Sequence, residues 1–186
     1  MSVRVKGLSM VAFERTLTEL KGDGAIERLF PGVPPEVAHA LRHKEILTVG
    51  WYPMEWFASL HTAAQLTYGP EISREIGRTA TRHDVTTLYR FILKFLSPET
   101  MVKQLGRIFT LFCETGTVHI EENRKGFARV KYGGCEGSSR GVWEDILGST
   151  EVLIELCGGK SPSARIISGG GSGEGTMVCE LSWTDR

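Results

Sequence analysis

The pattern of apolar residues changes at Gly116, and this change limits the fold class more than any other property of the sequence. Before Gly116, apolar residues recur at intervals of three and four, which indicates helices. After it, two pairs of alternating segments flank one more helical stretch, which indicates a ββαββ order. No segment of disordered composition separates the parts. We therefore expect one α+β domain over residues 1–186, with an N-terminal helical layer (1–116) packed on a small C-terminal antiparallel ββαββ sheet (117–186).

Glycine and proline divide the first part into separate helices. The expected helices cover residues 9–20, 25–30, 35–42, 53–67, 71–80, 84–96 and 98–112. Asp84 is placed to cap the sixth helix, and Ser97 followed by Pro98 begins the seventh. In the second part we expect strands over 117–122, 127–132, 164–168 and 176–183 and a helix over 141–156.

The charge balance excludes some classes of partner. The chain has 22 Lys and Arg against 22 Asp and Glu, divided almost evenly between the two parts. A protein that binds nucleic acid would show a basic excess, so we expect no nucleic-acid partner. No window approaches the roughly 18 apolar residues of a membrane span, and the N-terminus lacks the apolar core of a signal peptide. We therefore expect a cytoplasmic protein without a membrane span.

Four cysteines stand far apart in the sequence, and none forms a Cys-x-x-Cys pair. They are Cys113, Cys135, Cys157 and Cys179. In a cytoplasmic protein we expect these thiols to be reduced.

Two glycine-containing segments invite a phosphate or anion interpretation. Residues 157–161 (CGGKS) resemble the end of a phosphate-binding loop, but that motif requires a glycine where Ile154 stands and a helix where Pro162 follows. Residues 169–175 have the composition of a flexible hairpin loop. We expect neither segment to be a nucleotide site.

The histidines suggest two further sites. His39 and His43 have the i, i+4 spacing of metal ligands, but no third ligand can be named, so an exposed helix face explains them better. His83 and Asp84 would serve as a base and its orienting group if Cys113 lay nearby. A helix cap already accounts for Asp84, and we predict no metal ligand and no catalytic residue.

The aromatic residues are densest over residues 51–57. Aromatic residues of the later helices could meet this segment and form either a packed core or an apolar pocket with polar tips at Tyr52, Tyr89 and Arg90. The pocket interpretation predicts a lining of Trp51, Tyr52, Trp56, Phe57, Tyr89, Phe95 and Phe109. The alternative, that these residues simply fill the interior, stays open.

Several short motifs occur together in a characteristic order. They are Gly7-Leu8, Trp51-Tyr52-Pro53, Gly77-Arg78, Leu88-Tyr89-Arg90, Ser97-Pro98-Glu99, Glu114-Thr115-Gly116, the segment CGGK preceded by Leu156, and Leu181-Ser182-Trp183. In this order the chain resembles an uncharacterised family of proteins of this length from myxobacteria. That family is distantly similar to vinyl-reductase-type small-molecule-binding domains, haem–nitric-oxide-binding domains and trafficking-complex subunits that hold an acyl chain.

The resemblance implies a helical layer against a small antiparallel sheet with a hydrophobic cavity between them. The haem group of that set requires a Tyr-x-Ser-x-Arg motif and a proximal histidine. Neither Tyr68, Tyr89 nor Tyr132 begins such a motif, and nothing supports His61 as an iron ligand, so we expect no cofactor.

We therefore expect a non-enzymatic, cytoplasmic ligand-binding or sensory module whose partner is an apolar or uncharged small molecule. The first alternative is a protein-interaction subunit without a small ligand, either a homodimer or part of a signalling assembly. The second is a thiol or Cys–His enzyme, which would need a cysteine of low pKa.

Overall fold

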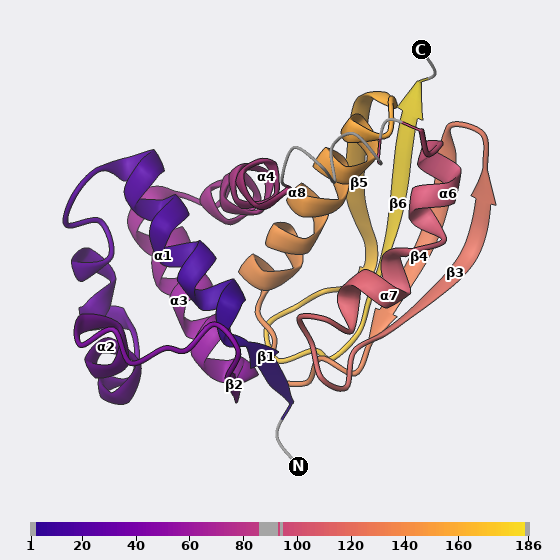
Figure 1. Cartoon of the computed structure of the whole chain (residues 1–186). Coiled ribbons are helices and arrows are strands. Elements are labelled where there is room, and N and C mark those ends of the chain that lie inside the picture. Colours follow the sequence, from indigo (N-terminus) through magenta and orange to yellow (C-terminus); the bar gives the residue numbers. More distant parts are fainter. Residues whose placement is uncertain (1–2, 86–92, 94, 185–186) are drawn as a thin grey trace.

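The computed structural model describes residues 3–85, 93 and 95–184. Figure 1 shows two parts side by side, a group of helices and a sheet with its own helices. The first part contains β1 (Arg4–Lys6), α1 (Gly7–Lys21), the 3-10 helix η1 (Glu27–Gly32), α2 (Pro35–Arg42), β2 (Trp51–Pro53), α3 (Met54–Tyr68) and α4 (Ile72–Asp84). The second contains α6 (Pro98–Val102), α7 (Leu105–Phe109), β3 (Thr117–Arg124), β4 (Phe127–Gly133), α8 (Arg140–Leu156), β5 (Lys160–Gly169) and β6 (Met177–Thr184).

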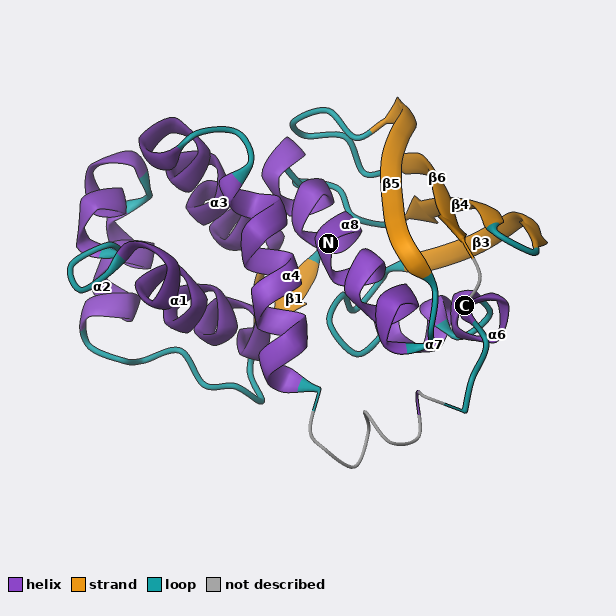
Figure 2. Cartoon of the chain, turned by 90° about the horizontal axis from the view of Figure 1, so that it is seen from above, coloured by secondary structure: helices purple, strands orange, loops and turns teal. Residues whose placement is uncertain are grey.

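The larger sheet has the strand order β3-β4-β6-β5, and every neighbouring pair is antiparallel. Side chains alternate between its two faces, as in β6, where Met177, Cys179 and Leu181 are buried. Helices cover the buried face: the Tyr132 ring of β4 lies 5.1 Å from Phe109 of α7 and 6.5 Å from Trp143 of α8. Figure 2 shows α8 between α4 and the sheet. The α+β prediction with a ββαββ sheet is confirmed.

Local capping explains where two helices begin. The Ser97 hydroxyl accepts a hydrogen bond from the Thr100 N–H at 3.2 Å, with Pro98 at the first helical position, as the sequence predicts. Ser139 caps α8 in the same way, accepting from the Val142 N–H. The helix predicted over residues 35–42 has the same bounds in the structure.

The predicted end of the fifth helix at residue 80 is wrong, and the amides that Asp84 is expected to cap lie outside the described residues. The helical turns that begin at Ile72 continue through Asp84, which is the last residue of α4, and its carboxylate pairs with Arg15 at 2.7 Å. Because no glycine or proline interrupts residues 81–84, the helix extends beyond its predicted end. Of the helix predicted over residues 84–96, residues 86–92 and 94 lie outside the described residues.

Three other predicted elements differ in detail. The helix expected over residues 98–112 is divided into α6 and α7, because the Gln104 N–H bonds to the Met101 carbonyl, three residues back, and interrupts the α-helical pattern. The segment near Phe30 is a 3-10 helix that contains Pro31. Trp51 and Tyr52 belong to β2, which pairs antiparallel with β1. Strands of three residues are too short to show an alternating pattern in the sequence.

The two parts meet along α8 and at the base. Helix α4 packs against α8 (Figure 1), and α3 also contacts α8, where the Ser139 hydroxyl donates to the Ala58 carbonyl at 3.3 Å. At the base, β1 joins the segment that follows α7: Val5 bridges Cys113, the Lys6 N–H donates to the Phe112 carbonyl at 2.8 Å, and the Glu114 N–H donates to the Arg4 carbonyl at 3.0 Å. Within the described residues, no helix is both long enough and apolar enough to cross a membrane.

Candidate functional site

The contact between α4 and α8, here called the seam, depends on glycine. A Cβ atom added at Gly77 of α4 would overlap the carbonyl oxygen of Asp145 and lie 2.8 Å from its carbonyl carbon. On the facing helix, a Cβ at Gly148 would overlap the carbonyl oxygen of Arg74 and lie 3.2 Å from its carbonyl carbon. Because neither glycine has a side chain, the two backbones touch directly, and ridges of larger side chains do not separate them.

A buried carboxylate holds the seam beside these glycines. Glu151 of α8 has a side chain only 4% exposed. It accepts hydrogen bonds from Arg74 at 3.1 Å, from Arg78 at 2.7 Å and from the Ala164 N–H of β5 at 2.9 Å. Arg74 also donates to Glu144 at 2.8 Å. Glu151 therefore links α4, α8 and β5, and its charge is compensated by two arginines, as a buried charge requires.

A cavity of about 560 Å³ opens at the end of the seam, between α4 and the turn that joins α8 to β5. Its lining consists of Arg78, Arg82, Glu151, Val152, Glu155, Gly158, Gly159, Lys160, Ser161 and Pro162. The volume lies within the range of small-molecule sites. Two of the lining residues, Arg78 and Glu151, also hold the seam together.

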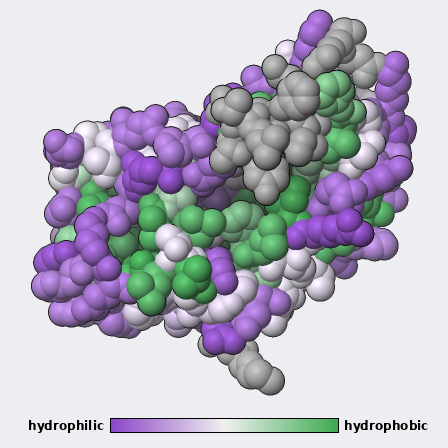
Figure 3. Space-filling model, viewed as in Figure 1, coloured by the Kyte–Doolittle hydropathy of each residue, from purple (hydrophilic) through white to green (hydrophobic). Residues whose placement is uncertain are grey.

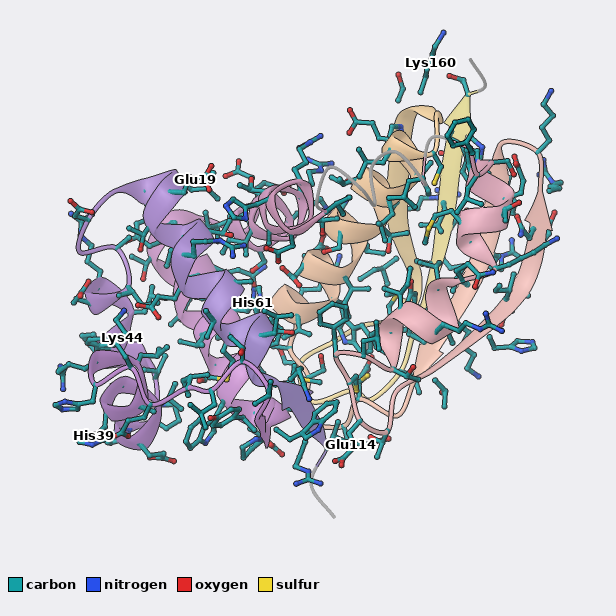
Figure 4. All side chains as sticks on the ribbon, in the orientation of Figure 1. Glu19, His39, Lys44, His61, Glu114 and Lys160 are labelled. Atoms are coloured by element: carbon teal, nitrogen blue, oxygen red, sulfur yellow. The ribbon has the colours of Figure 1, made fainter. Side chains whose placement is uncertain are left out.

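The charged side chains of this cavity differ in their ion pairs. Arg82 pairs with Glu155 at 2.7 Å, but both side chains are half-exposed, so this pair contributes little stability. Lys160 is exposed, and its ammonium forms no ion pair with any described residue. Figure 4 places Lys160 at the far end of the molecule from β1. The lining therefore carries three cationic side chains: two arginines, which pair with carboxylates of the same lining, and Lys160.

Residues 157–161, considered above as a phosphate loop, line this cavity in part. They follow the C-terminus of α8 and lead into a strand, so no helix N-terminus faces the cavity. Ser161 has a φ of 48°, a left-handed conformation that is unusual for a residue with a side chain. The other glycine-rich segment is the loop between β5 and β6, where the Gly171 N–H donates to the Glu174 carboxylate at 3.0 Å. That amide is therefore satisfied within its own loop.

The structure divides the seven predicted pocket residues between the two parts. The Tyr52 and Trp56 rings lie 5.8 Å apart, and Phe57 packs in the N-terminal helical core 4.5 Å from the His61 ring. Phe109 packs on Tyr132 in the second part. Trp51 is partly exposed and has Lys6 above its ring, Phe95 is 75% exposed, and Tyr89 lies outside the described residues. None of the six described residues lines the cavity at the seam, so the aromatic pocket stays a prediction.

The histidines considered above as ligands or as a base, His39, His43 and His83, are exposed. The His39 and His43 rings lie 4.3 Å apart on an exposed face of α2. The described part of the chain contains no group of three or more His, Cys, Asp or Glu side chains that could hold a metal ion. His83 lies 3.4 Å from Asp84, but Asp84 pairs with Arg15, and the Cys113 sulfur lies beside Cys135.

Two titratable groups near the seam have shifted pKa values: His61, which is buried, and Asp145, which is half-buried. His61 of α3 bonds through Nδ1 to Ser73 at 3.0 Å, and the edges of Phe13 and Phe57 enclose its ring. Burial lowers the pKa of His61 to about 3, and its Nε2 has no partner in the described structure. Burial raises the pKa of Asp145 to about 7. Nothing in the sequence distinguishes these residues from exposed ones, because burial is set by the packing of distant segments.

No protein-family model matches the chain, and no curated protein matches it in sequence. Solved structures do match. The structure of an Fe(II) unliganded H-NOX protein from K. algicida is 16% identical, with 97% of each chain covered and a TM-score of 0.67. The oxygen complex of an oxygen-binding H-NOX domain related to soluble guanylate cyclases is 14% identical, with 97% of this chain and 96% of that chain covered and a TM-score of 0.65. At this identity the matches show the fold, and the chain has an H-NOX-like fold.

The described histidines and the lining of the cavity at the seam do not fit haem. Haem iron takes an axial ligand from a His, Cys, Met or Tyr side chain. All five histidines fall within the described residues: four are exposed, and aromatic side chains enclose His61. The cavity at the seam is lined mostly by charged and polar groups and includes none of these four residue types. The chain therefore combines an H-NOX-like fold with a cavity of different chemistry.

Proposed function

We propose that this chain is a ligand-binding sensory domain, not an enzyme, and that its ligand occupies the cavity at the end of the seam. The observation that carries the proposal is the double role of Arg78 and Glu151, which line the cavity and hold α4 against α8. A ligand that binds one arrangement of this pair better than another shifts the population of the two helix arrangements. The H-NOX-like fold, which sensory proteins share, supports the same interpretation.

The lining favours a small polar ligand with an anionic group over the apolar or uncharged ligand expected from the neutral composition. Arg78 is 40% exposed on the cavity side while it binds Glu151. An anionic group beside Arg78, Arg82 and Lys160 would compete with Glu151 for the Arg78 guanidinium. Since Glu151 is buried, weakening its pair with Arg78 would loosen the seam. Binding of a ligand in the cavity would thereby change how α4 packs against α8.

A thermal-shift titration of the full chain tests this proposal. The probes are inorganic phosphate and a panel of small mono- and dicarboxylates at constant ionic strength. We expect at least one probe to shift the melting temperature of the wild type, and the shift to disappear in K160Q and R82Q. Lys103, which is exposed at the end of α6, provides the matched control K103Q, which should keep the shift. An equal shift in all four proteins, or none with any probe, would refute the proposed site.

Native mass spectrometry of the purified chain then reports any ligand retained from the cell and the oligomeric state together. A hemin titration serves as a separate check, because the geometry predicts no specifically ligated haem spectrum.

A second candidate function, a protein-interaction subunit, is favoured by exposed apolar side chains around β1. They are Leu8, Leu47, Val49, Leu111 and Phe112. Hydrogen bonds place their segments together, including Leu8 N–H to the Thr48 carbonyl and Lys6 N–H to the Phe112 carbonyl. Figure 3 shows hydrophobic residues gathered on this face. Contiguous apolar surface of this kind often marks an interface. Light scattering of the wild type and of V49D tests it: a homodimer that V49D makes monomeric would support this function, and a wild-type monomer would count against the homodimer.

The remaining expectations belong to the same proposal. We propose that residues 1–186 act as a single domain, that the protein is cytoplasmic, and that it belongs to the myxobacterial family named above. The H-NOX-like fold over 97% of the chain supports the single domain.

A further inference from the structure

Two cysteines from separate loops meet at the base of the molecule. Cys113 follows α7 and Cys135 follows β4, and their sulfur atoms lie 3.5 Å apart. Both residues are buried, with exposed fractions of 2% and 1%. None of the four cysteines takes part in a disulfide. Cys113 lies next to the strand β1, and neither cysteine lines the cavity at the seam.

The backbone brings the two sulfurs together without a covalent bond. The Thr115 hydroxyl donates to the Gly134 carbonyl at 2.8 Å, and the Cys135 N–H donates to the Gly175 carbonyl at 3.1 Å. Gly134 has a φ of 72°, and a Cβ at this position would lie 3.0 Å from the Thr115 carbonyl carbon. Just beyond, Thr117 pairs with Gly133 in the β3–β4 ladder. The fold therefore fixes both loops on either side of the sulfurs.

The surroundings make the two thiols unequal. The contact between the two sulfurs lowers the pKa of the Cys113 thiol, although burial acts in the opposite direction. The same contact and burial raise the pKa of Cys135. Cys113 is thus the more acidic of the two thiols. A thiolate is the nucleophilic form of cysteine.

We propose that Cys113 and Cys135 are a redox site that forms a reversible disulfide with a small peroxide as oxidant. The Cys113 thiolate attacks one peroxide oxygen, so that an S–O bond forms, the O–O bond breaks, and hydroxide leaves and is protonated to water. The Cys135 sulfur then attacks the sulfenic acid sulfur of Cys113. An S–S bond forms, the S–O bond breaks, and the oxygen leaves as water with the Cys135 proton. The two thiols lose two electrons and hydrogen peroxide is reduced to two waters.

Closing this bond would act on the junction between the two parts. The sulfurs must approach from 3.5 Å to about 2.05 Å, the length of a disulfide. Cys113 bridges Val5, and its neighbours bond to Lys6 and Arg4 of β1. Because β1 leads directly into α1, movement of Cys113 toward Cys135 pulls on the strand that anchors the helical layer. This inference does not depend on a ligand in the cavity.

Peptide mapping of the full chain after oxidation tests the proposal. The reduced protein is treated with hydrogen peroxide and blocked with an alkylating agent, and its peptides are separated without reductant. We expect a linked pair of peptides containing Cys113 and Cys135, two thiols lost of four, and full recovery of four thiols with dithiothreitol. C157S should still form the link, and C113S and C135S should not.

Two results would overturn the proposal. One is a folded protein that keeps all four thiols under conditions that oxidise dithiothreitol completely. The other is thiol loss through links to Cys157 or Cys179, or between two chains, without the 113–135 link. If C113S or C135S does not fold, the wild-type peptide map still decides. Hydrogen exchange of the amides of residues 4–8 then tests the consequence: protection should change on oxidation and return on reduction, and unchanged protection would refute the coupling to β1.

Discussion

Substituting Gly77 by alanine tests whether direct backbone contact holds the two parts together. The added methyl group would overlap the Asp145 carbonyl oxygen and lie 2.8 Å from its carbonyl carbon and 3.0 Å from its Cα, where ordinary contacts are 3.4–4 Å. These are backbone atoms of α8, which cannot rotate away as a side chain tip can. The variant must therefore move α4 away from α8.

The expected loss of stability follows from opposing effects. Overpacking of a tight contact costs about 1–3 kcal/mol. Moving α4 also lengthens the bonds from Arg74 and Arg78 to the buried Glu151, and partly separating such a pair adds to the loss. Replacing glycine by alanine within a helix raises the stability of the folded protein by up to about 1 kcal/mol, and this gain offsets part of the loss. We expect G77A to be less stable than the wild type by about 2–3 kcal/mol.

Urea unfolding followed by circular dichroism measures this difference. Gly106 provides the matched control, because it also lies in a helix but a Cβ there would meet only Val118 atoms at 3.9 and 4.0 Å. G106A should gain about 0.4–1 kcal/mol. If G77A is as stable as the wild type, or gains stability as G106A does, the glycine contact does not determine how α4 packs on α8.

Three further predictions concern charges at or near the seam. E151Q should lose about 2–3 kcal/mol in the same urea assay, since two arginines lose a buried partner and the exposure of Arg78 reduces the cost. The pKa of Asp145 is raised to about 7, so the folded chain binds a proton that the unfolded chain lacks above about pH 4. Stability from this group is therefore lost as pH rises toward 7. We expect D145N to be more stable than the wild type at pH 8 and equal to it near pH 4; equal stability at pH 8 would argue against desolvation of this half-buried carboxylate. The pKa of His61 is lowered to about 3, so stability should fall as pH drops below 6.5, by about 2 kcal/mol at pH 5; in the D145N background, H61Q should remove this slope.

The order of the elements could be predicted from the sequence because local signals determine most of them. Ser97 and Pro98 begin α6, Gly22 follows the end of α1, and the turn at Gly126 joins β3 to β4. Where a contact between distant segments decides the structure, the prediction is wrong or incomplete. Asp84 continues α4 while its carboxylate pairs with Arg15, 69 residues earlier in the chain. The strand β2 forms through its pairing with β1, and β1 also bonds to the distant segment that follows α7.

The candidate site could not be predicted for the same reason. Arg78 and Glu151 are 73 positions apart, and each resembles an ordinary exposed charge in the sequence. Gly77 looks like an unfavourable residue within a helix until the Asp145 carbonyl is found against it. The aromatic segment at residues 51–57 is conspicuous in composition, but its members divide between a small sheet and a helical core. Residue type signals a site only when the residues that form it are near in sequence.

The two junctions between the parts suggest how one chain could report two different signals. At the seam, the Arg78–Glu151 pair lines a cavity, and under the proposed function this pair responds to the charge of a ligand. At the base, β1 is bonded to the residues on either side of Cys113, and under the proposed redox site this contact responds to oxidation of the thiol. Figure 4 shows Lys160 and Glu114, which mark these junctions, at opposite ends of the molecule. Because the helical layer is attached at both, either signal can change its position against the sheet, and both together give an effect that depends on their coupling. Combining C135S with K160Q measures that coupling, because independent junctions give additive changes in stability.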